Sequence, residues 1–335
     1  MPSNRLRILV IGTGSIGERH VRCYLATGRA EIGICEINND LSATIAERYA
    51  ISEVYSDVAT ALAQPWDAVL VATPAHTHIP IALQAARAGR HLIIEKPLST
   101  SLDGIEELQR LVAEHKLVTA VSYNYRAHPG VRAMKAALDS GRFGRPLQLY
   151  AMVGQSFPTY RPAYREIYFA DRSQGGGAVQ DAMTHTLNLA EWFIGPITRI
   201  TVDAAHQSLE GVTVEDTVHA MARHGEIMAS YALNLYQHPN ESHITVVCEK
   251  ATVRFALHEK RWRCMTEPDG VWQDEIHELA DRDTWYIHNA NAMLDTIAGT
   301  TRALCTLEEG LQTLRVNLAA LRSMETQTWQ AIGEH

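Results

Sequence analysis

Cysteine is scarce in this sequence, and no two cysteines form a CxxC pair. The five lie far apart, at Cys23, Cys35, Cys248, Cys264 and Cys305. Because zinc ribbons and redox dithiols need closely spaced cysteines, this spacing argues against both and favours a reducing compartment. We expect these residues to be small buried hydrophobic side chains.

Long apolar runs and basic clusters are missing too. No run approaches the roughly 18 residues that cross a bilayer, and the apolar stretch at residues 8–11 is too short for the core of a signal peptide. The net charge is −8, whereas nucleic-acid and anionic membrane surfaces depend on clustered positive charge. We expect a cytoplasmic protein that binds a small molecule, and neither a nucleic acid nor a membrane.

Histidine is frequent, with 16 residues, but its pattern does not suggest a metal site. Zinc ligands usually occur at paired spacings with cysteine or carboxylate support. No such pairing is found among His206, His219, His224, His238, His243, His258, His277 and His288. We therefore expect no metal centre and interpret these histidines as solvated or core side chains.

The 335 residues have the length of about two domains. In residues 1–125, short apolar runs alternate with amphipathic segments, which is typical of a parallel sheet whose strands alternate with helices. Strands are expected at residues 6–11, 31–36, 68–72, 91–94 and 118–123. Helices are expected at residues 15–27, 41–49, 79–88 and 101–114.

The pattern changes after about residue 145 to the period-two alternation of antiparallel strands. Strands are expected at residues 147–153, 198–204, 213–222, 227–235, 243–248 and 252–256, and helices at 179–193, 284–300 and 306–328. Residues 126–335 are therefore expected to form an α+β domain with a large, mostly antiparallel open sheet. We expect this domain to bind the substrate and to form the contacts between subunits.

A glycine-rich loop follows the first expected strand and opens the first expected helix. It consists of Gly12, Thr13, Gly14, Ser15, Ile16 and Gly17. In a dinucleotide site the first glycine permits a tight turn, the second lets the backbone approach a pyrophosphate, and the third allows close packing of the helix. A glycine turn without a ligand is the alternative, but the βαβ setting favours a Rossmann NAD-binding domain in residues 1–125.

Glu36 closes the second expected strand, where such folds place the carboxylate that binds the adenosine ribose. A carboxylate accepts hydrogen bonds from two ribose hydroxyls but would repel a 2'-phosphate. The next residues, Ile37 and Asn38, supply no cation to offset that repulsion. NAD is therefore expected in preference to NADP.

Four further motifs make the interpretation more specific. They are Ala72-Thr73-Pro74 followed by His78, Glu95-Lys96-Pro97, Tyr123-Asn124-Tyr125-Arg126, and the glycine-rich run from Gly175 that ends in the DxxxH pattern of Asp181 and His185. With the glycine loop, they resemble in kind and order the family of glucose-fructose oxidoreductase, inositol dehydrogenase and rhizopine-catabolism proteins (Gfo/Idh/MocA). The resemblance covers both expected domains.

The resemblance implies a site built from both domains. In the family the lysine of the EKP motif lies beside the nicotinamide and the substrate hydroxyl, and the DxxxH residues line the same pocket. These roles would fall on Lys96, Asp181 and His185. The residues implied to bind the cofactor, besides the glycine loop and Glu36, are Thr73, Pro74, His78, Glu95, Lys96 and Asn124. Where the family often has an acidic residue, three positions after the histidine, this chain has Asn188.

The chemistry of these side chains agrees with an alcohol oxidation. Asp181 and His185 are four residues apart on an expected helix and so share one face. His185 would act as the general base, and Asp181 would orient it or bind a substrate hydroxyl. Lys96 would stabilise the developing alkoxide. In other surroundings, a surface cation and a helix-surface hydrogen bond would be the commoner roles for such residues.

Residues 156–172 form a loop rich in tyrosine and arginine. Aromatic rings stack on sugars and guanidinium groups bind hydroxyls or carboxylates, so this loop is a candidate for substrate contacts. The candidates within it are Tyr160, Arg161, Tyr164, Arg165 and Tyr168. The residues expected to bind the substrate are Lys96, Arg126, Tyr160, Arg165, Asp181 and His185. The alternative is a loop at a subunit interface, with substrate contacts near Tyr236, His238 and His288.

Together these features predict an NAD-dependent dehydrogenase acting on a secondary hydroxyl of a sugar, cyclitol or sugar derivative. One alternative is a glycosidase or lyase in which bound NAD is transiently reduced and then regenerated. The other is a regulator that binds NAD without catalysis. A large antiparallel sheet with one uncovered face, together with the resemblance, predicts a homodimer or homotetramer.

Overall fold

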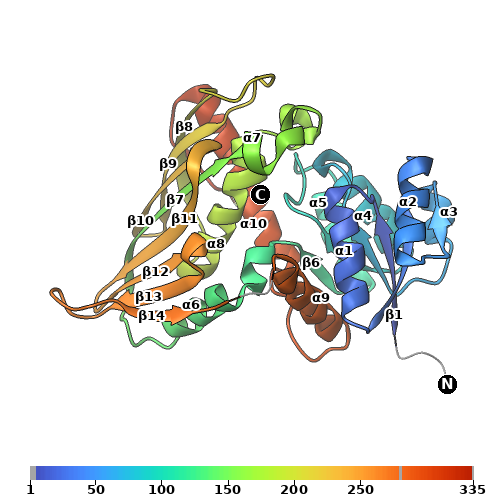
Figure 1. Cartoon of the computed structure of the whole chain (residues 1–335), viewed down its shortest axis with the longest axis horizontal. Coiled ribbons are helices and arrows are strands. Elements are labelled where there is room, and N and C mark those ends of the chain that lie inside the picture. The colour runs from blue at the N-terminus through green and yellow to red at the C-terminus, as the bar shows by residue number, and fades with distance from the viewer. Residues whose placement is uncertain (1–4, 279–280, 334–335) are drawn as a thin grey trace. The chain divides into compact units, whose positions relative to one another are not determined.

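The computed structural model describes residues 5–278 and 281–333 (Figure 1). They form two compact units, with unit 1 drawn from Met1–Ala127 and Ala280–Gly310 and unit 2 from His128–Leu279 and Leu311–His335. The expected division into residues 1–125 and 126–335 stays a prediction, and residues 281–310 of the expected second domain belong to unit 1. Residues 1–4, 279–280 and 334–335 of the expected domains lie outside the described residues.

Unit 1 contains a six-stranded parallel sheet in the order β3-β2-β1-β4-β5-β6. Its strands are β1 (Leu6–Ile11), β2 (Ala30–Cys35), β3 (Val54–Tyr55), β4 (Ala68–Val71), β5 (His91–Ile94) and β6 (Thr119–Val121). β1 pairs with β2 on one side and with β4 on the other. The strand order therefore reverses at β1, and in such sheets ligands bind beyond the carboxyl ends of the strands at this point.

Helices accompany this sheet along the sequence, as the alternating pattern predicted. They are α1 (Ser15–Ala26), α2 (Asn39–Tyr49), α3 (Val58–Leu62), α4 (His78–Arg87), α5 (Ile105–Glu114) and α9 (Asp283–Ile297), with the 3-10 turns η1 (Ala75–Thr77) and η2 (Asn124–Ala127). Although α9 lies late in the chain, its Ala290, Met293 and Leu294 belong to the same buried cluster as β1 and α1. Arg19 of α1 forms an ion pair with Asp283 of α9 at 3.0 Å.

Unit 2 contains a nine-stranded sheet in the order β14-β13-β12-β11-β7-β10-β9-β8-β15. Its strands are β7 (Pro146–Ser156), β8 (Arg199–Ala205), β9 (Thr217–His224), β10 (Ile227–Asn234), β11 (Tyr236–Cys248), β12 (Thr252–Ala256), β13 (Arg261–Met265), β14 (Gln273–Ile276) and β15 (Gln330–Ala331). β7 and β10 pair in parallel, and the other neighbours pair antiparallel. The expected fold class, a Rossmann-type sheet plus a mostly antiparallel one, is confirmed.

The two faces of the sheet in unit 2 differ. The helices of this unit are α6 (Pro129–Asp139), α7 (Phe157–Tyr160), α8 (Thr184–Ile194) and, from Leu311 onward, α10 (Leu307–Thr326). The unit also contains short turns: η3 (Pro162–Arg165), η4 (Tyr168–Ala170), η5 (Arg172–Gln174), the π-helical turn η6 (Val179–Met183) and η7 (Leu257–Glu259). α6, α8 and α10 lie on one face of this sheet (Figure 1). On the other face, Met221 of β9 and Met228 of β10 are each 55% exposed.

None of the helices in residues 5–278 and 281–333 is long and apolar enough to cross a membrane. The same residues contain no group of three or more His, Cys, Asp or Glu side chains that could hold a metal ion. All five cysteines are buried, as expected.

Candidate active site

The glycine loop of unit 1 has the geometry that its sequence predicted. Gly12 has a φ of 86°, and a Cβ there would lie 2.8 Å from the carbonyl oxygen of Ala72. At Gly17 a Cβ would lie 1.9 Å from the carbonyl oxygen of Gly12, so the third glycine lets α1 pack against the turn. At Gly14 a Cβ would meet no atom of the described residues within 4 Å. The backbone is therefore bare and accessible at the N-terminus of α1, where the helix dipole favours a phosphate.

Glu36 is held against this loop. Its Oε2 accepts hydrogen bonds from the backbone N–H of Thr13 at 2.8 Å and from the Thr13 hydroxyl at 3.2 Å. Its Oε1 accepts from the backbone N–H of Asn38 at 3.0 Å. The carboxylate at the end of β2 is thus fixed beside the first turn of the loop, as expected for a ribose ligand.

His78 links two of the expected cofactor motifs. Its Nε2 lies 2.8 Å from the carbonyl oxygen of Thr73, which precedes Pro74 in the first motif. Its Nδ1 lies 3.0 Å from the carbonyl oxygen of Pro97 in the second motif. Burial lowers the pKa of the His78 imidazole, so the ring is neutral at pH 7 and donates from one nitrogen at a time. The bond between Lys96 and Pro97 is cis.

Glu95 and His20 form a buried pair beneath Lys96. The Nε2 of His20 lies 2.6 Å from Oε1 of Glu95, and Oε2 of Glu95 accepts from the backbone N–H of Lys96 at 3.0 Å. Burial favours the neutral carboxyl, but the hydrogen bond to His20 and the charges of His20 and Lys96 outweigh it and lower the pKa of Glu95. The ionised Glu95 therefore fixes the backbone from which the Lys96 side chain extends.

Sequence reasoning missed His20. The available signal was a histidine on the apolar face of the helix that follows the glycine loop, with Val21 and Tyr24 beside it. Such a residue is more often a core histidine than a functional one. Its importance depends on Glu95, which is 75 residues away in the sequence.

Asn124 and Arg126 lie in the turn η2 of unit 1. The Nδ2 of Asn124 donates to the carbonyl oxygen of Ser122 at 3.1 Å, and its Oδ1 is buried without a hydrogen-bond partner among the residues that the structure describes. This oxygen stays a candidate acceptor for the cofactor. Arg126 is buried, and its Nη1 donates to the carbonyl oxygen of Leu304 at 3.0 Å and pairs with Glu309 at 3.1 Å. These contacts favour a packing role over the expected substrate contact.

In unit 2 the glycine-rich run shapes the start of the helix that carries the DxxxH pattern. Gly177 has a φ of 86°, and a Cβ there would lie 2.5 Å from Oε1 of Glu215. That oxygen accepts from the backbone N–H of Val179 at 3.1 Å, and Oε2 of Glu215 accepts from Arg172 at 2.6 Å. Glu215 thereby binds a backbone donor that the first helical turn leaves without a partner in the helix.

Asp181 lies in η6 and His185 in the first turn of α8. π-Helical turns are rare and often mark functional sites. The Asp181 side chain is fully buried, with Oδ1 accepting from the Tyr168 hydroxyl at 2.7 Å and Oδ2 from Nη1 of Arg161 at 2.8 Å. His185 is partly buried. The helical turn thus presents a charge-paired carboxylate followed by an imidazole.

Buried polar contacts anchor α8 to α10. Nδ2 of Asn188 donates to the hydroxyl of Thr313 at 2.9 Å, and Nδ2 of Asn317 donates to that of Thr184 at 2.8 Å. Asn188 stands where the family often has an acidic residue. In this chain the position contributes helix packing, and it supplies no second carboxylate.

The tyrosine- and arginine-rich loop directs its side chains to two acidic residues, Asp181 and Glu210. Arg161 and Tyr168 contact Asp181, whereas Nε of Arg165 donates to the backbone oxygen of Glu210 at 2.7 Å. Tyr160 is 52% exposed. Arg161 and Tyr168, rather than the expected Tyr160 and Arg165, are therefore the loop residues that reach the DxxxH motif.

Each unit gathers one part of the expected site. Unit 1 brings the glycine loop and Glu36 together, and links the Thr73 and Lys96 motifs through His78. Unit 2 brings Asp181 together with two residues of the loop.

Two family models match the chain. Residues 6–123 match the model of an oxidoreductase family with an NAD-binding Rossmann fold. Residues 131–254 match the model of the Gfo/Idh/MocA C-terminal domain. The two matches follow each other in the order of the two units.

Curated relatives of the chain include dehydrogenases. The chain is 29% identical over 205 residues to levoglucosan dehydrogenase of Pseudarthrobacter phenanthrenivorans. This alignment covers 58% of this chain and 53% of that protein. It is 31% identical over 199 residues to inositol 2-dehydrogenase of Azotobacter vinelandii, and this alignment covers 56% of this chain and 54% of that protein. The chain thus spans about half the length of the curated relatives that it matches.

Solved structures share the fold over the whole chain. Levoglucosan dehydrogenase in complex with NADH and levoglucosan matches with a TM-score of 0.89 at 22% identity, covering 98% of this chain and 100% of that one. The WlbA dehydrogenase of Bordetella pertussis in complex with NADH and UDP-GlcNAcA matches with a TM-score of 0.85 at 24% identity, covering 100% of both chains. At these identities the likeness shows the fold.

Proposed function

Because the chain belongs to the Gfo/Idh/MocA family of NAD-binding oxidoreductases, we propose that it is an NAD-dependent dehydrogenase acting on a secondary hydroxyl of a sugar, cyclitol or sugar derivative. The observation that carries the proposal is the pair of preorganised half-sites. Unit 1 combines a glycine loop that has open space at Gly14 with Lys96, whose backbone N–H donates a hydrogen bond to the Glu95 carboxylate. Unit 2 presents Asp181 and His185 on one helical turn.

The residues of unit 1 fit a dinucleotide. The open space at Gly14 would hold a pyrophosphate at the N-terminus of α1, and Glu36, which is fixed beside the loop, would accept hydrogen bonds from the ribose hydroxyls. When bound, NAD supplies the group that takes up hydride from the alcohol carbon, or delivers it in the reverse direction.

The protein's own groups would manage the proton and the charge. His185 would take the proton of the substrate hydroxyl on an imidazole nitrogen, since an imidazole ordinarily titrates near neutral pH. The ammonium group of Lys96 would donate a hydrogen bond to the same oxygen as negative charge develops there. Asp181 would accept a hydrogen bond from a second hydroxyl and so orient the substrate.

The proposal is tested by incubating the purified protein with NAD and a panel of cyclitols, aldoses and glycosides. Stoichiometric NADH formation with at least one polyol would support a dehydrogenase. Substrate conversion without NADH release would instead indicate the glycosidase or lyase with transient redox chemistry. NAD binding without any conversion would indicate the regulator.

Cofactor preference gives a prediction of its own. We expect kcat/KM to be at least about 10-fold higher with NAD than with NADP, a difference of about 1.4 kcal/mol, because Glu36 would repel a 2'-phosphate. Glu36→Ala should relax this preference by removing the repulsion. Glu47→Ala, which removes an exposed carboxylate near the C-terminal end of α2, should leave the preference for NAD unchanged. Equal or better use of NADP by the unaltered protein would contradict the assignment.

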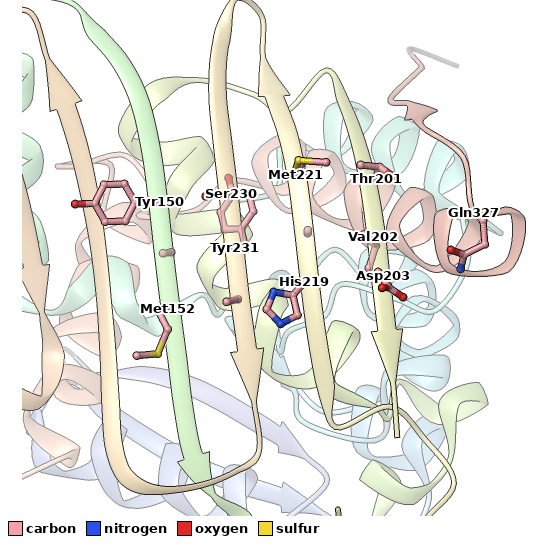
Figure 2. A pocket seen from close by; sticks show the side chains of 13 residues that line it. Tyr150, Met152, Thr201, Val202, Asp203, His219, Met221, Ser230, Tyr231 and Gln327 are labelled. Atoms are coloured by element: carbon pink, nitrogen blue, oxygen red, sulfur yellow. The ribbon is translucent and has the colours of Figure 1, made fainter. Parts of the chain in front are cut away.

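Location and assembly also belong to the proposal. A cytoplasmic location is favoured by the scattered, buried cysteines, since reducing compartments do not use disulfides. The uncovered face of the sheet in unit 2 supports a homodimer or homotetramer. It is hollowed by about 530 Å³ and bears Tyr150, Met152, His219, Met221 and Ser230 from three adjacent strands (Figure 2).

Met221 provides the test of assembly. It lies opposite Ser230 on this face and is 55% exposed. If a second copy covers the face, Met221→Glu should weaken association at least about 10-fold, because a carboxylate would be buried without a partner. Light scattering over a dilution series measures this. A monomeric mass for the unaltered protein would contradict the proposal.

A further inference from the structure

The carboxylate of Asp181 is held by two side chains of the loop that precedes it. Nη1 of Arg161 donates to Oδ2 at 2.8 Å, and the Tyr168 hydroxyl donates to Oδ1 at 2.7 Å. The Asp181 side chain has no exposed surface, whereas that of Arg161 is 33% exposed. Each carboxylate oxygen thus accepts a strong hydrogen bond from a side chain of the loop.

The loop is built to deliver these donors. Phe157, Tyr164 and Phe169 form a buried aromatic cluster with the Phe157 and Phe169 centroids 5.0 Å apart, which anchors the loop at both ends. The guanidinium of Arg161 lies over the Phe157 ring, 5.1 Å from its centroid. Stacking and pairing together restrict the Arg161 side chain to one direction.

Glycine is required where the loop meets the helix. A Cβ at Gly176 would lie 2.5 Å from the backbone oxygen of Tyr168 and 2.4 Å from that of Phe169. Only a residue without a side chain lets the Tyr168 segment approach this closely. The glycine-rich run therefore serves the contact between Tyr168 and Asp181 as well as the start of the helix.

The electrostatics favour one protonation state of Asp181. A buried carboxylate without partners would be strongly destabilised, and an adjacent guanidinium favours its ionised form. Charge-assisted hydrogen bonds of this kind are stronger and more directional than neutral ones. An ionised, fixed carboxylate can accept hydrogen bonds but cannot donate one.

We propose that Arg161 and Tyr168 are positioning residues that keep Asp181 ionised and in one orientation, as the acceptor for a substrate hydroxyl. The role of Asp181 as an acceptor rests on the proposed function. The clamp, by which we mean the two hydrogen bonds that Arg161 and Tyr168 donate to Asp181, rests on the contacts within unit 2. The two residues thereby act on substrate binding through Asp181.

The kinetic test compares loop variants with a control variant. Arg161→Ala should raise the substrate KM by about 10-fold or more, and Tyr168→Phe by about 3-fold or more, with the NAD dissociation constant unchanged. Arg161→Lys should restore part of the loss because it restores the charge. Arg145→Ala, which removes an exposed ion pair of unit 2 outside this loop, should leave KM unchanged.

A double-mutant cycle separates positioning from loop stability. If Arg161 acts through Asp181, Arg161→Ala should add no further loss in an Asp181→Asn background. Additive losses, or an Arg161→Ala variant with normal KM, would overturn the proposal. Thermal unfolding of each variant identifies any that fails to fold, and Arg161→Lys then carries the comparison.

A second measurement needs no substrate. Carbon-13 NMR of the aspartate carboxyl groups, with the Asp181 signal assigned by its loss in Asp181→Asn, reports the ionisation of this residue directly. Arg161→Ala should move the midpoint of this titration up by about one pH unit or more. An unchanged midpoint would overturn the clamp. A raised midpoint in a protein that oxidises no polyol would support the clamp and contradict only the proposed function.

Discussion

Lys96→Ala is expected to lower kcat by about 100-fold or more while NAD affinity changes only a few-fold. A preorganised donor at the reacting oxygen stabilises charge that develops in the transition state, so its loss appears in kcat rather than in cofactor binding. Glu95 holds the Lys96 backbone and would remain in place in the variant. Steady-state kinetics and NAD titration by protein fluorescence measure the two quantities.

The control for this variant is Lys250→Ala, which removes an exposed lysine in the turn between β11 and β12. It should retain normal turnover. Near-normal kcat in Lys96→Ala would remove Lys96 from the catalytic residues and would leave the EKP motif with a structural role.

His185→Ala is expected to lower kcat by about 100-fold or more and to remove one ionisation from the pH profile of kcat/KM. A positioned general base contributes about 10²- to 10⁴-fold, and an imidazole ordinarily titrates near neutral pH. The loss should be greatest in the neutral range, where the unprotonated imidazole can accept the substrate proton. The pH dependence of kcat/KM, measured with one polyol and saturating NAD, provides the test.

His115→Ala serves as the matched control, since His115 is an exposed histidine at the end of α5. Its pH profile should keep every ionisation. If His185→Ala also keeps the complete profile and near-normal turnover, another group takes up the proton, and the assignment of His185 is wrong.

The central elements of unit 1 could be predicted almost to the residue. β1 at Leu6–Ile11 and β5 at His91–Ile94 coincide with the expected ranges, because buried parallel strands read as short apolar runs between helices. β3 was missed since it has only two residues, Val54–Tyr55. β14 was missed because Gln273–Ile276 is exposed throughout and shows no alternation.

The local sequence pattern could not predict where α9 packs. Periodicity predicted a helix at 284–300, and the structure has one at Asp283–Ile297. Periodicity defines an apolar face but not the surface that this face will bury. The packing of Met293 and Leu294 with the core around β1 is a contact between residues more than 250 positions apart, and no window of sequence contains it.

In the candidate site, too, some features could be predicted from the sequence and others could not. The glycine loop was predictable because positive φ and close approach require glycine at defined spacings. The choice between Arg161 and Arg165 was not, since both are arginines beside tyrosines in one loop. The turn η3 between them directs one to Asp181 and the other to Glu210, and this depends on the folded path of the chain.

The most direct test of the account is NADH formation by the purified protein with NAD and a panel of cyclitols, aldoses and glycosides. Absorbance of NADH in the near ultraviolet should rise in proportion to the polyol oxidised, for at least one member of the panel. The rise should be lost in Lys96→Ala and in His185→Ala and kept in Lys250→Ala and His115→Ala. Conversion of a substrate with no NADH released, or no conversion of any polyol by a protein that binds NAD, would contradict the account.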